Sequence, residues 1–304
     1  MRSPQQGVAI VLAMSVVALA ALAATAMLVS QSTWARRVEL NAGHVQAKLV
    51  IVAGLDWARA VLSDDQRNGV VDHAGEPWAL RLPVIPVENG SLEGRIEDQQ
   101  GRFNLNNLQS NGRVDPAQVA HLLRLLSVLD LPTALAGALA DWIDADSEPQ
   151  AQDGAEDETY LALQPPYRAA NRPLIDVAEL ALVRGYDARV RERLRPFVSA
   201  LPRFTAVNVN TAPAEVLYAI VDHLPLDDAR AIVAERGQGY FRSVGEFSAR
   251  LPRGLSAETR DIAVGSDYFV ASMRATIGGT QARGSALLAR EKAGWPTIVW
   301  RKTP

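Results

Sequence analysis

The chain of 304 residues lacks cysteine, and only 6% of its residues are aromatic. Without cysteine, disulfide scaffolds, thiolate catalysis and cysteine-ligated zinc are excluded. An excess of positive charge is also missing: 31 Lys and Arg face 34 Asp and Glu, a formal net charge of −3, so no bulk field attracts nucleic acid phosphates.

Catalytic motifs are missing as well. The sequence has no H-E-x-x-H, G-x-S-x-G or P-loop pattern, and its histidines are scattered, at His44, His73, His121 and His223. We expect His121 and His223, which fall in helical segments, to be partly buried polar residues. The sequence therefore does not predict an enzyme.

One long apolar run is present, from Val8 to Val29, with Ser15 and Thr25 as its polar members. A run of about 22 residues is long enough to span a bilayer. No proline occurs over residues 34–62, so we expect one helix over residues 8–62, with 8–29 in the membrane. Its second half continues apolar positions at close to helical spacing, namely Val38, Val45, Leu49, Val52, Leu55, Ala58 and Leu62.

A cleaved secretory signal peptide is the alternative interpretation of this run. Small residues at 18–20 or 24–26 would serve as its cleavage site. The run exceeds the usual apolar region of about 7 to 15 residues in such peptides, and the helical pattern continues beyond it. Both observations favour a membrane anchor.

Strand signals occur in two separated regions. Residues 78–82 and 92–98 form the first group, and the alternating segment 268–277, followed by Gly278-Gly279, forms the second. Residues 287–290 and 297–302 could complete an antiparallel sheet. Pairing between the two groups implies that residues 106–265 are an inserted domain between sheet regions 63–105 and 266–304.

The inserted segment is helical by pattern, which gives an α+β fold class. We expect helices at residues 116–129, 133–143, 174–183, 188–197, 212–221 and 226–234. Residues 103–107 and 207–211 resemble each other, and each precedes a helix, a Leu-Pro corner and a second helix. This pattern favours a duplicated helix-hairpin-helix or SAM-like unit, with chance similarity of short helices as the alternative. The repeated asparagines are expected to cap helices and satisfy loop backbone: Asn104, Asn106, Asn208 and Asn210.

Acidic side chains are concentrated in residues 141–160, which contain no Lys or Arg. So many carboxylates repel one another unless a cation neutralises them, and oxygen ligands without His or Cys favour Ca²⁺ over zinc or copper. An EF-hand is excluded, because a loop beginning at Asp144 would put Pro149 where glycine is needed and Ala155 where the bidentate carboxylate belongs. A solvated acidic loop is the alternative. Glycosidase-like use of paired carboxylates is disfavoured, since no aromatic sugar platform accompanies them.

The N-terminus resembles that of type IV pilin-like precursors, with a polar leader, MRSPQQG, followed by the apolar helix. This resemblance implies that a prepilin peptidase cleaves between Gly7 and Val8 and methylates the new amine of Val8. The family usually has Glu at the fifth mature residue, where this chain has Leu12. A carboxylate in hydrocarbon is costly unless a neighbour's amine meets it, so leucine fits a subunit with nothing packed above it, at a filament tip.

The chain is similar over nearly its whole length to K-type minor pseudopilins of type II secretion systems, which lack this Glu and carry an inserted helical domain with similar repeats. The resemblance implies a type IV pilin-like fold with a small antiparallel sheet, and a tip position from which pseudopilus assembly and protein export are supported. It also implies a structural Ca²⁺ in the Asp-rich loop, with these ligands: Asp144, Asp146, Asp153, Glu156 and Asp157, and less firmly Glu148.

The same resemblance implies partners and a location. The partners are the I-type and J-type minor pseudopilins, with the H type as a further candidate, the prepilin peptidase and the inner-membrane assembly platform; nucleic acid is not among them. The chain would cross the bacterial inner membrane once, with its C-terminal body in the periplasm.

A membrane-anchored DNA-uptake receptor is the second hypothesis, because residues 207–247 are similar to the helix-hairpin-helix of such receptors. In those proteins a Gly-x-Gly presents backbone N–H groups to a phosphate. Here the corner is residues 224–228, which has no glycine; Pro225 has no N–H, and Asp227 and Asp228 bring negative charge. DNA binding is therefore disfavoured.

Overall fold

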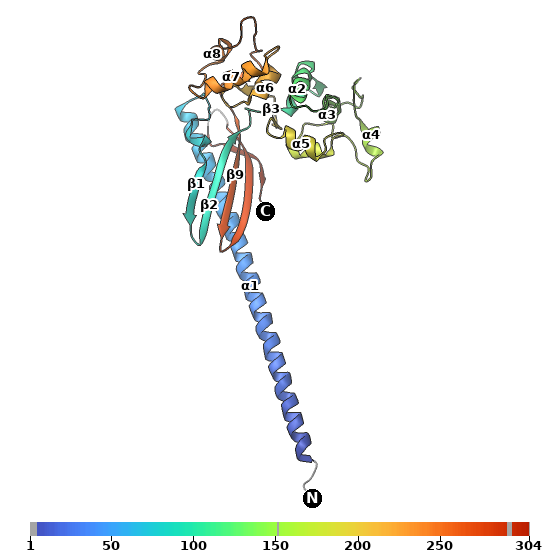
Figure 1. The fold of residues 1–304 in the computed structure, drawn as a ribbon, viewed down its shortest axis with the longest axis vertical. Coiled ribbons are helices and arrows are strands. Elements are labelled where there is room, and N and C mark those ends of the chain that lie inside the picture. Colours follow the sequence, from blue (N-terminus) through green and yellow to red (C-terminus); the bar gives the residue numbers. More distant parts are fainter. Residues whose placement is uncertain (1–4, 151, 291–293, 304) are drawn as a thin grey trace.

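A long helix dominates the computed structural model, which describes residues 5–150, 152–290 and 294–303 (Figure 1). This helix, α1 (Gln5–Asn68), has 64 residues, about 96 Å at 1.5 Å per residue. It continues six residues beyond the predicted end at Leu62, because Gly69 is the first helix-breaking residue after the polar segment that follows. The leader residues 1–4 lie outside the described residues.

The second half of α1 packs on a five-stranded antiparallel sheet, ordered β1-β2-β9-β10-β11. Its strands are β1 (Leu82–Val87), β2 (Gly90–Asp98), β9 (Tyr268–Ile277), β10 (Thr280–Ala289) and β11 (Thr297–Lys302). The N-terminal and C-terminal strand groups thus join side by side, with β2 against β9. The chain leaves the sheet after β2, forms the helical insertion and re-enters the sheet at β9.

Two strand predictions were wrong in detail. Residues 78–82 were expected to be a strand, but the chain forms the 3₁₀ helix η1 (Pro77–Ala79), and β1 starts at Leu82. Trp78 is buried there, with its ring edge-on to Phe269 at 5.1 Å between centroids. Burial of the indole therefore favours the 3₁₀ helix over the expected strand. Residues 287–290, expected as a separate strand, belong to the end of the longer β10 and its following residue.

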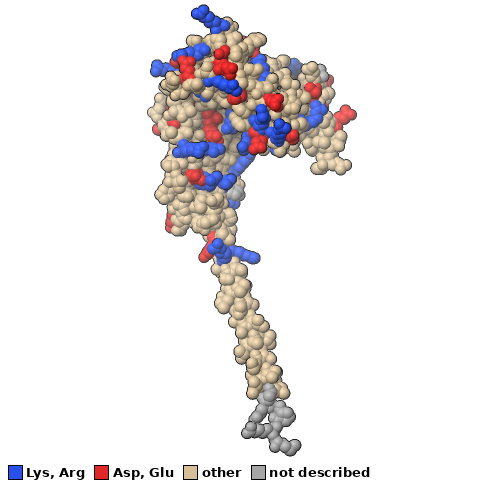
Figure 2. All heavy atoms as spheres, viewed as in Figure 1, with Lys and Arg blue, Asp and Glu red and all other residues tan. Residues whose placement is uncertain are grey.

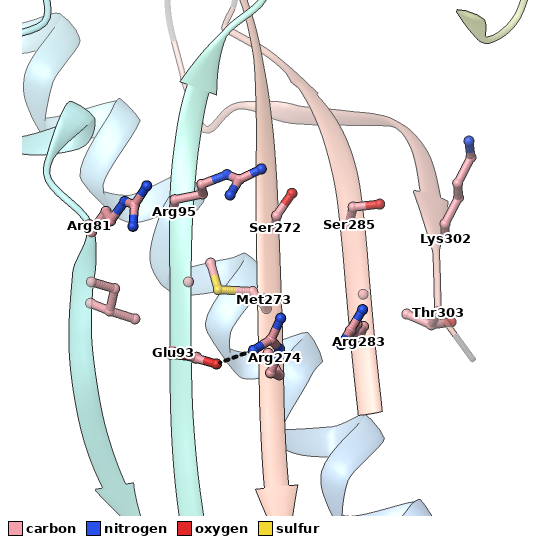
Figure 3. A pocket seen from close by; sticks show the side chains of 13 residues that line it. Arg81, Glu93, Arg95, Ser272, Met273, Arg274, Arg283, Ser285, Lys302 and Thr303 are labelled. Carbon is pink, nitrogen blue, oxygen red and sulfur yellow. Dashed lines mark ion pairs between the residues drawn. The ribbon is translucent and has the colours of Figure 1, made fainter. Parts of the chain in front are cut away.

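One stripe of α1 covers the inner face of the sheet. Its buried residues are Ala47, Ile51, Leu55, Ala58 and Leu62. Val38, Val45 and Leu49, which the sequence pattern grouped with Leu55 and Leu62, are exposed instead. Gly54 permits close contact, since a Cβ there would lie 3.2 Å from Leu92 Cδ2 and Met273 Sδ. The outer face of the sheet carries polar and basic side chains (Figure 3).

The insertion stands at the end of α1 far from the N-terminus, partly beyond the sheet and partly to one side (Figure 1). Its elements are β3 (Phe103–Asn104), η2 (Leu105–Leu108), β4 (Gln109–Ser110), β5 (Arg113–Val114), α2 (Pro116–Val128), α3 (Leu135–Ile143), α4 (Asp157–Leu161), η3 (Val177–Leu182), α5 (Ala188–Leu194), β6 (Val198–Ser199), β7 (Val207–Asn208), α6 (Ala214–Ile220), α7 (Leu226–Arg236), α8 (Val244–Ser248) and β8 (Ile262–Ala263). The segment 174–183 is therefore a 3₁₀ helix, shorter than the predicted one. The α+β class predicted from the sequence is confirmed.

The two similar segments of the insertion are held in the same way. Asn104 and Asn208 each accept a hydrogen bond from the backbone N–H two residues later. Asn106 makes a two-way amide contact with the backbone of Leu174, and Asn210 makes the corresponding contact with Phe241. Each segment also pairs in parallel with a later strand, β3 with β6 and β7 with β8. The asparagines therefore satisfy buried backbone, as expected.

Charge divides the molecule into two parts. Figure 2 shows an uncharged surface along the lower, free part of α1 and charged side chains over the sheet and the insertion. No charged residue occurs between Arg2 and Arg36. The net charge near zero therefore hides two unlike parts. The stalk, which is the free N-terminal half of α1, is uncharged, and the body, which is the sheet with the insertion, carries many charges of both signs.

Candidate functional site

The free half of α1 is the first candidate site. It is the described helix that is long and apolar enough to cross a membrane, and its most apolar window has no contact with the rest of the chain. Ser15 and Thr25 donate their hydroxyl hydrogens to the carbonyl oxygens of Val11 and Ala21, at 2.9 and 2.8 Å. Both polar side chains are thus satisfied within the helix, as a hydrocarbon environment requires.

The predicted processing and assembly residues lie on this exposed stalk. Val8 and Leu12 are each 61% exposed and contact no other part of the described chain. The helix runs without a break through Gly7 and Val8, although the side chains of residues 5–7 are outside what the structure describes. The apolar character of Leu12 leaves no carboxylate in this part of the helix.

A second candidate site lies where α3 ends. Asp144 caps the C-terminal end of α3, Glu156 precedes α4, and Asp146 stands in the loop between them. One carboxylate oxygen from each of the three lies within 4.8 Å of the others. Three of the residues chosen from the sequence, Asp144, Asp146 and Glu156, are therefore brought together.

Two members of this acidic cluster have no hydrogen-bond donor. Asp144 is 1% exposed and Glu156 is 7% exposed, and both oxygens of each carboxylate are without a partner in the described part of the chain. Burial, and then repulsion from Asp146, raises the pKa of Asp144 to about 7. Burial, and then repulsion from Asp141, raises the pKa of Glu156 to about 7. Buried carboxylates without donors fit a hard cation, which would supply the missing positive charge.

The loop that carries the cluster is shaped by a neighbouring carboxylate. Asp141, which is fully buried, accepts hydrogen bonds from the backbone N–H groups of Gln150 and Ala155, at 3.1 and 2.6 Å. Gly154 is needed beside it, since a Cβ there would lie 2.6 Å from an Asp141 oxygen. These contacts fold the loop back so that Glu156 approaches Asp144.

The remaining predicted ligands point elsewhere. Asp157 accepts a hydrogen bond from Ala169 N at 3.0 Å and pairs with Arg168 at 3.3 Å. Asp153 and Glu148 are exposed and are not part of the three-carboxylate cluster. A residue outside the predicted set lies close by: Asn171 donates to the carbonyl oxygen of Asp146 at 2.9 Å, and its buried amide oxygen lacks a partner among the described residues. No charge pattern marks Asn171, so sequence reasoning could not select it.

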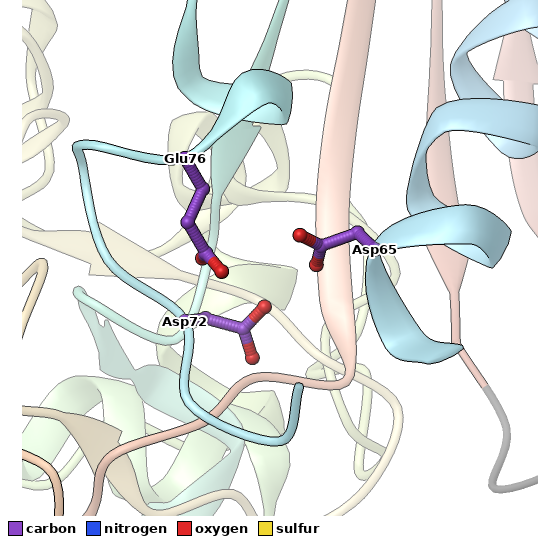
Figure 4. Close-up of side chains that lie close together, drawn as sticks. All are labelled: Asp65, Asp72 and Glu76. Atoms are coloured by element: carbon purple, nitrogen blue, oxygen red, sulfur yellow. The ribbon is translucent and has the colours of Figure 1, made fainter. Parts of the chain in front are cut away.

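Another group of carboxylates, Asp65, Asp72 and Glu76, lies at the junction of α1 with the sheet (Figure 4). Here donors are present. Arg290 donates to Asp65 at 2.7 Å and to Asp72 at 2.6 Å, while Glu76 accepts from Trp78 Nε1 at 2.8 Å. Since a guanidinium already pairs with two of the three carboxylates and the third accepts from an indole N–H, this cluster is structural.

The hairpin between α6 and α7 has the polarity expected from its sequence. Asp227 lies at its exposed tip and pairs with Arg230 at 3.0 Å. His121 is buried, with Nε2 at 4.0 Å from an Asp261 oxygen. His223 is exposed, contrary to expectation, because it follows the end of α6 in a left-handed turn with φ of 60°. Neither the tip of this hairpin nor the two histidines form a cluster of positive charge that would attract a phosphate.

Comparison with known proteins gives a consistent result. Two family models described as type II secretion system protein K match residues 101–203 and 207–264, so their limits follow the two similar segments. The type II secretion system protein K of Pseudomonas aeruginosa is 39% identical over 315 residues, covering 99% of this chain and 93% of that protein. The Klebsiella pneumoniae protein of the same name is 32% identical over 308 residues, with 96% and 94% covered.

A solved structure agrees with these relatives. It is the GspK-GspI-GspJ complex of the enterotoxigenic Escherichia coli type 2 secretion system. One chain of that structure matches 88% of the present chain over 99% of its own length, with 29% sequence identity and a TM-score of 0.77. These likenesses do not favour the DNA-uptake receptor. With its long N-terminal helix, its small antiparallel sheet and its helical insertion, the chain belongs to the type II secretion system protein K family and is a minor pseudopilin.

Proposed function

We propose that this minor pseudopilin occupies the tip of the pseudopilus and initiates its assembly there. The observation that carries the proposal is the position of the insertion, which projects at the end of α1 far from the N-terminus (Figure 1). A second subunit stacked above in the same orientation would meet this bulk. Leu12 supports the proposal, because a tip subunit has no neighbour above whose terminal amine would pair with a buried carboxylate.

The I-type and J-type minor pseudopilins are the proposed partners. The related solved structure is described as a GspK-GspI-GspJ complex, and this chain offers a free, uncharged helix for packing against sister helices. In a bilayer such packing relies on close van der Waals contact between helices, for which the alanine-rich stretch 18–26 is suited. The H-type pseudopilin is a further candidate partner in the filament, and the assembly platform would act on the chain from the inner membrane.

Maturation and orientation complete the proposal. A prepilin peptidase would cut between Gly7 and Val8 and methylate the Val8 amine, after which the stalk begins with an apolar residue. The charged body would lie in the periplasm and the stalk in the inner membrane. The role is assembly and support of export, without catalysis.

A bound Ca²⁺ would serve the stability of the insertion. Asp144, Asp146 and Glu156 would hold it, with the Asn171 amide oxygen as a neutral ligand. Carboxylate and amide oxygens are the donors that Ca²⁺ prefers. The ion would neutralise two buried carboxylates that have no other partner and so fix the loop between α3 and α4.

The absence of cysteine makes the tip position directly testable. A single cysteine placed by Arg253→Cys, at an exposed site of the insertion, would be the chain's only thiol and would accept a maleimide-gold label. We expect gold at one end of each purified pseudopilus in electron micrographs. The cysteine-free chain is the control for labelling of other components. Gold along the filament, or at neither end, would contradict the tip proposal.

A further inference from the structure

A basic hollow lies on the outer face of the sheet, on the side away from α1. Its volume is about 680 Å³. Figure 3 shows cationic side chains around it from β2, β9, β10 and β11 and from Arg81, the residue before β1. The cations are Arg81, Arg95, Arg274, Arg283 and Lys302, and Glu93 is the one carboxylate in the lining. The hollow is therefore opposite in sign to the chain as a whole, whose net charge is −3.

Strand register builds the hollow from two adjacent rows. Glu93, Arg274 and Arg283 lie opposite one another on β2, β9 and β10. The next row on the same face holds Arg95, Ser272, Ser285 and Lys302, in that order across the sheet. Side chains two positions apart on a strand share a face, so the rows are neighbours. The short serines form the floor, and the long basic side chains form the walls.

The positive charge of the hollow is only partly neutralised. Arg274 pairs with Glu93 at 3.0 Å, Arg95 pairs with Glu97 at 3.0 Å, and Lys302 reaches Asp176 in the insertion at 2.7 Å. Arg81 and Arg283 are exposed and have no ion pair or hydrogen bond to any residue that the structure describes. Like charges on one sheet face repel one another, so an anionic occupant would lower the free energy of this surface.

We propose that the basic hollow binds an extended acidic segment of a partner protein. Five strands about 4.8 Å apart make a face about 19 Å across, which matches about six residues of extended chain. A single small anion would engage only one or two of the five cations, whereas carboxylates along a segment would meet several. Since α1 packs on the opposite face, the hollow stays accessible when α1 joins other helices.

The test uses the full chain in a neutral detergent and a fluorescent peptide of glutamate residues. Fluorescence anisotropy measures its affinity, with a glutamine peptide of equal length as the uncharged probe. The variant Arg81→Gln/Arg283→Gln removes the two unpaired cations. The matched control Arg189→Gln/Arg253→Gln removes two exposed cations from the insertion and changes the net charge equally.

We expect the acidic peptide to bind, the glutamine peptide not to bind, and rising salt to weaken the affinity. The Arg81→Gln/Arg283→Gln variant should bind the acidic peptide roughly tenfold more weakly, and the control variant within about twofold of the unaltered chain. Circular dichroism should show both variants folded. Equal losses in both variants, no binding at low salt, or equally effective displacement by the same concentration of inorganic phosphate would each overturn the proposal.

Discussion

At the scale of single residues, Asp144 and Glu156 cost stability unless something neutralises them. A buried carboxylate without a donor loses its hydration and gains nothing in exchange, and here two such groups lie close to Asp146. A bound cation would neutralise the carboxylates and replace their lost hydration, whereas a proton would only reduce the repulsion between them. The cluster therefore links the stability of the insertion to the supply of a cation.

We expect Ca²⁺ to raise the melting temperature of the chain and a chelator to lower it. A ligand at 100 times its Kd stabilises the native state by about 2.7 kcal/mol. The variant Asp144→Asn/Glu156→Gln should lose the response to Ca²⁺ and, in chelator, melt no lower than the unaltered chain, because its repulsion is removed. Differential scanning calorimetry measures both effects.

The control is Glu148→Gln/Asp153→Asn, which removes two charges from the same loop but not from the cluster. It should keep the response to Ca²⁺. If the unaltered chain melts identically in Ca²⁺ and in chelator, the cluster holds no ion.

The sequence predicted the acidic segment but not which carboxylates meet. Charge density marked residues 141–160, because repulsion is evident from composition alone. The convergence of Asp144 with Glu156 depends on the backbone path, which Asp141 fixes through two N–H donors and Gly154 permits. Such contacts are tertiary, so the spacing along the chain does not encode them.

At the scale of elements, the strongest local signals were reliable. The alternation in 268–277 predicted β9, and the helix predicted at 116–129 is α2, which Asp115 caps by accepting a hydrogen bond from Ala117 N. The helices α4 and α8 were missed, because five residues make too short a pattern to show helical periodicity. The buried stripe of α1 also differed from expectation, since residues 49–53 are all apolar and so do not reveal which face of the helix meets the sheet.

That stripe gives an element-scale prediction. Leu55 is 1% exposed between α1 and the sheet, whereas Leu49 is 65% exposed on the same helix. Leu55→Ala should lower the free energy of unfolding by about 2 to 5 kcal/mol, from lost burial and the cavity left behind. Leu49→Ala should change it by less than about 0.5 kcal/mol. Urea unfolding of the isolated chain, followed by tryptophan fluorescence, distinguishes them; equal losses would contradict the packing described.

At the scale of the whole molecule, one buried network joins the stalk, the sheet and the insertion. Arg290, at the end of β10, donates to Asp65 of α1, to Asp72 and to the carbonyl oxygen of Ser266. Asn208 of the insertion donates to the carbonyl oxygen of Asp72 at 3.1 Å. The insertion is thus connected to the pseudopilin body through polar contacts whose strength depends on protonation.

This junction should weaken as the pH rises. Burial, with repulsion from Glu76 and Asp72, raises the pKa of Asp65 to about 6, and the positive charge of Arg290 offsets only part of this shift. A carboxyl group whose pKa is higher in the folded than in the unfolded state favours folding below its unfolded value, about 4, and that contribution is lost as the pH rises through about 6. With Ca²⁺ saturating, calorimetry from pH 4 to 7 should therefore show a fall in stability that Asp65→Asn reduces. Asp64→Asn, at the exposed neighbouring position, should keep the slope of the unaltered chain; an Asp65→Asn profile parallel to it would refute the assignment to Asp65.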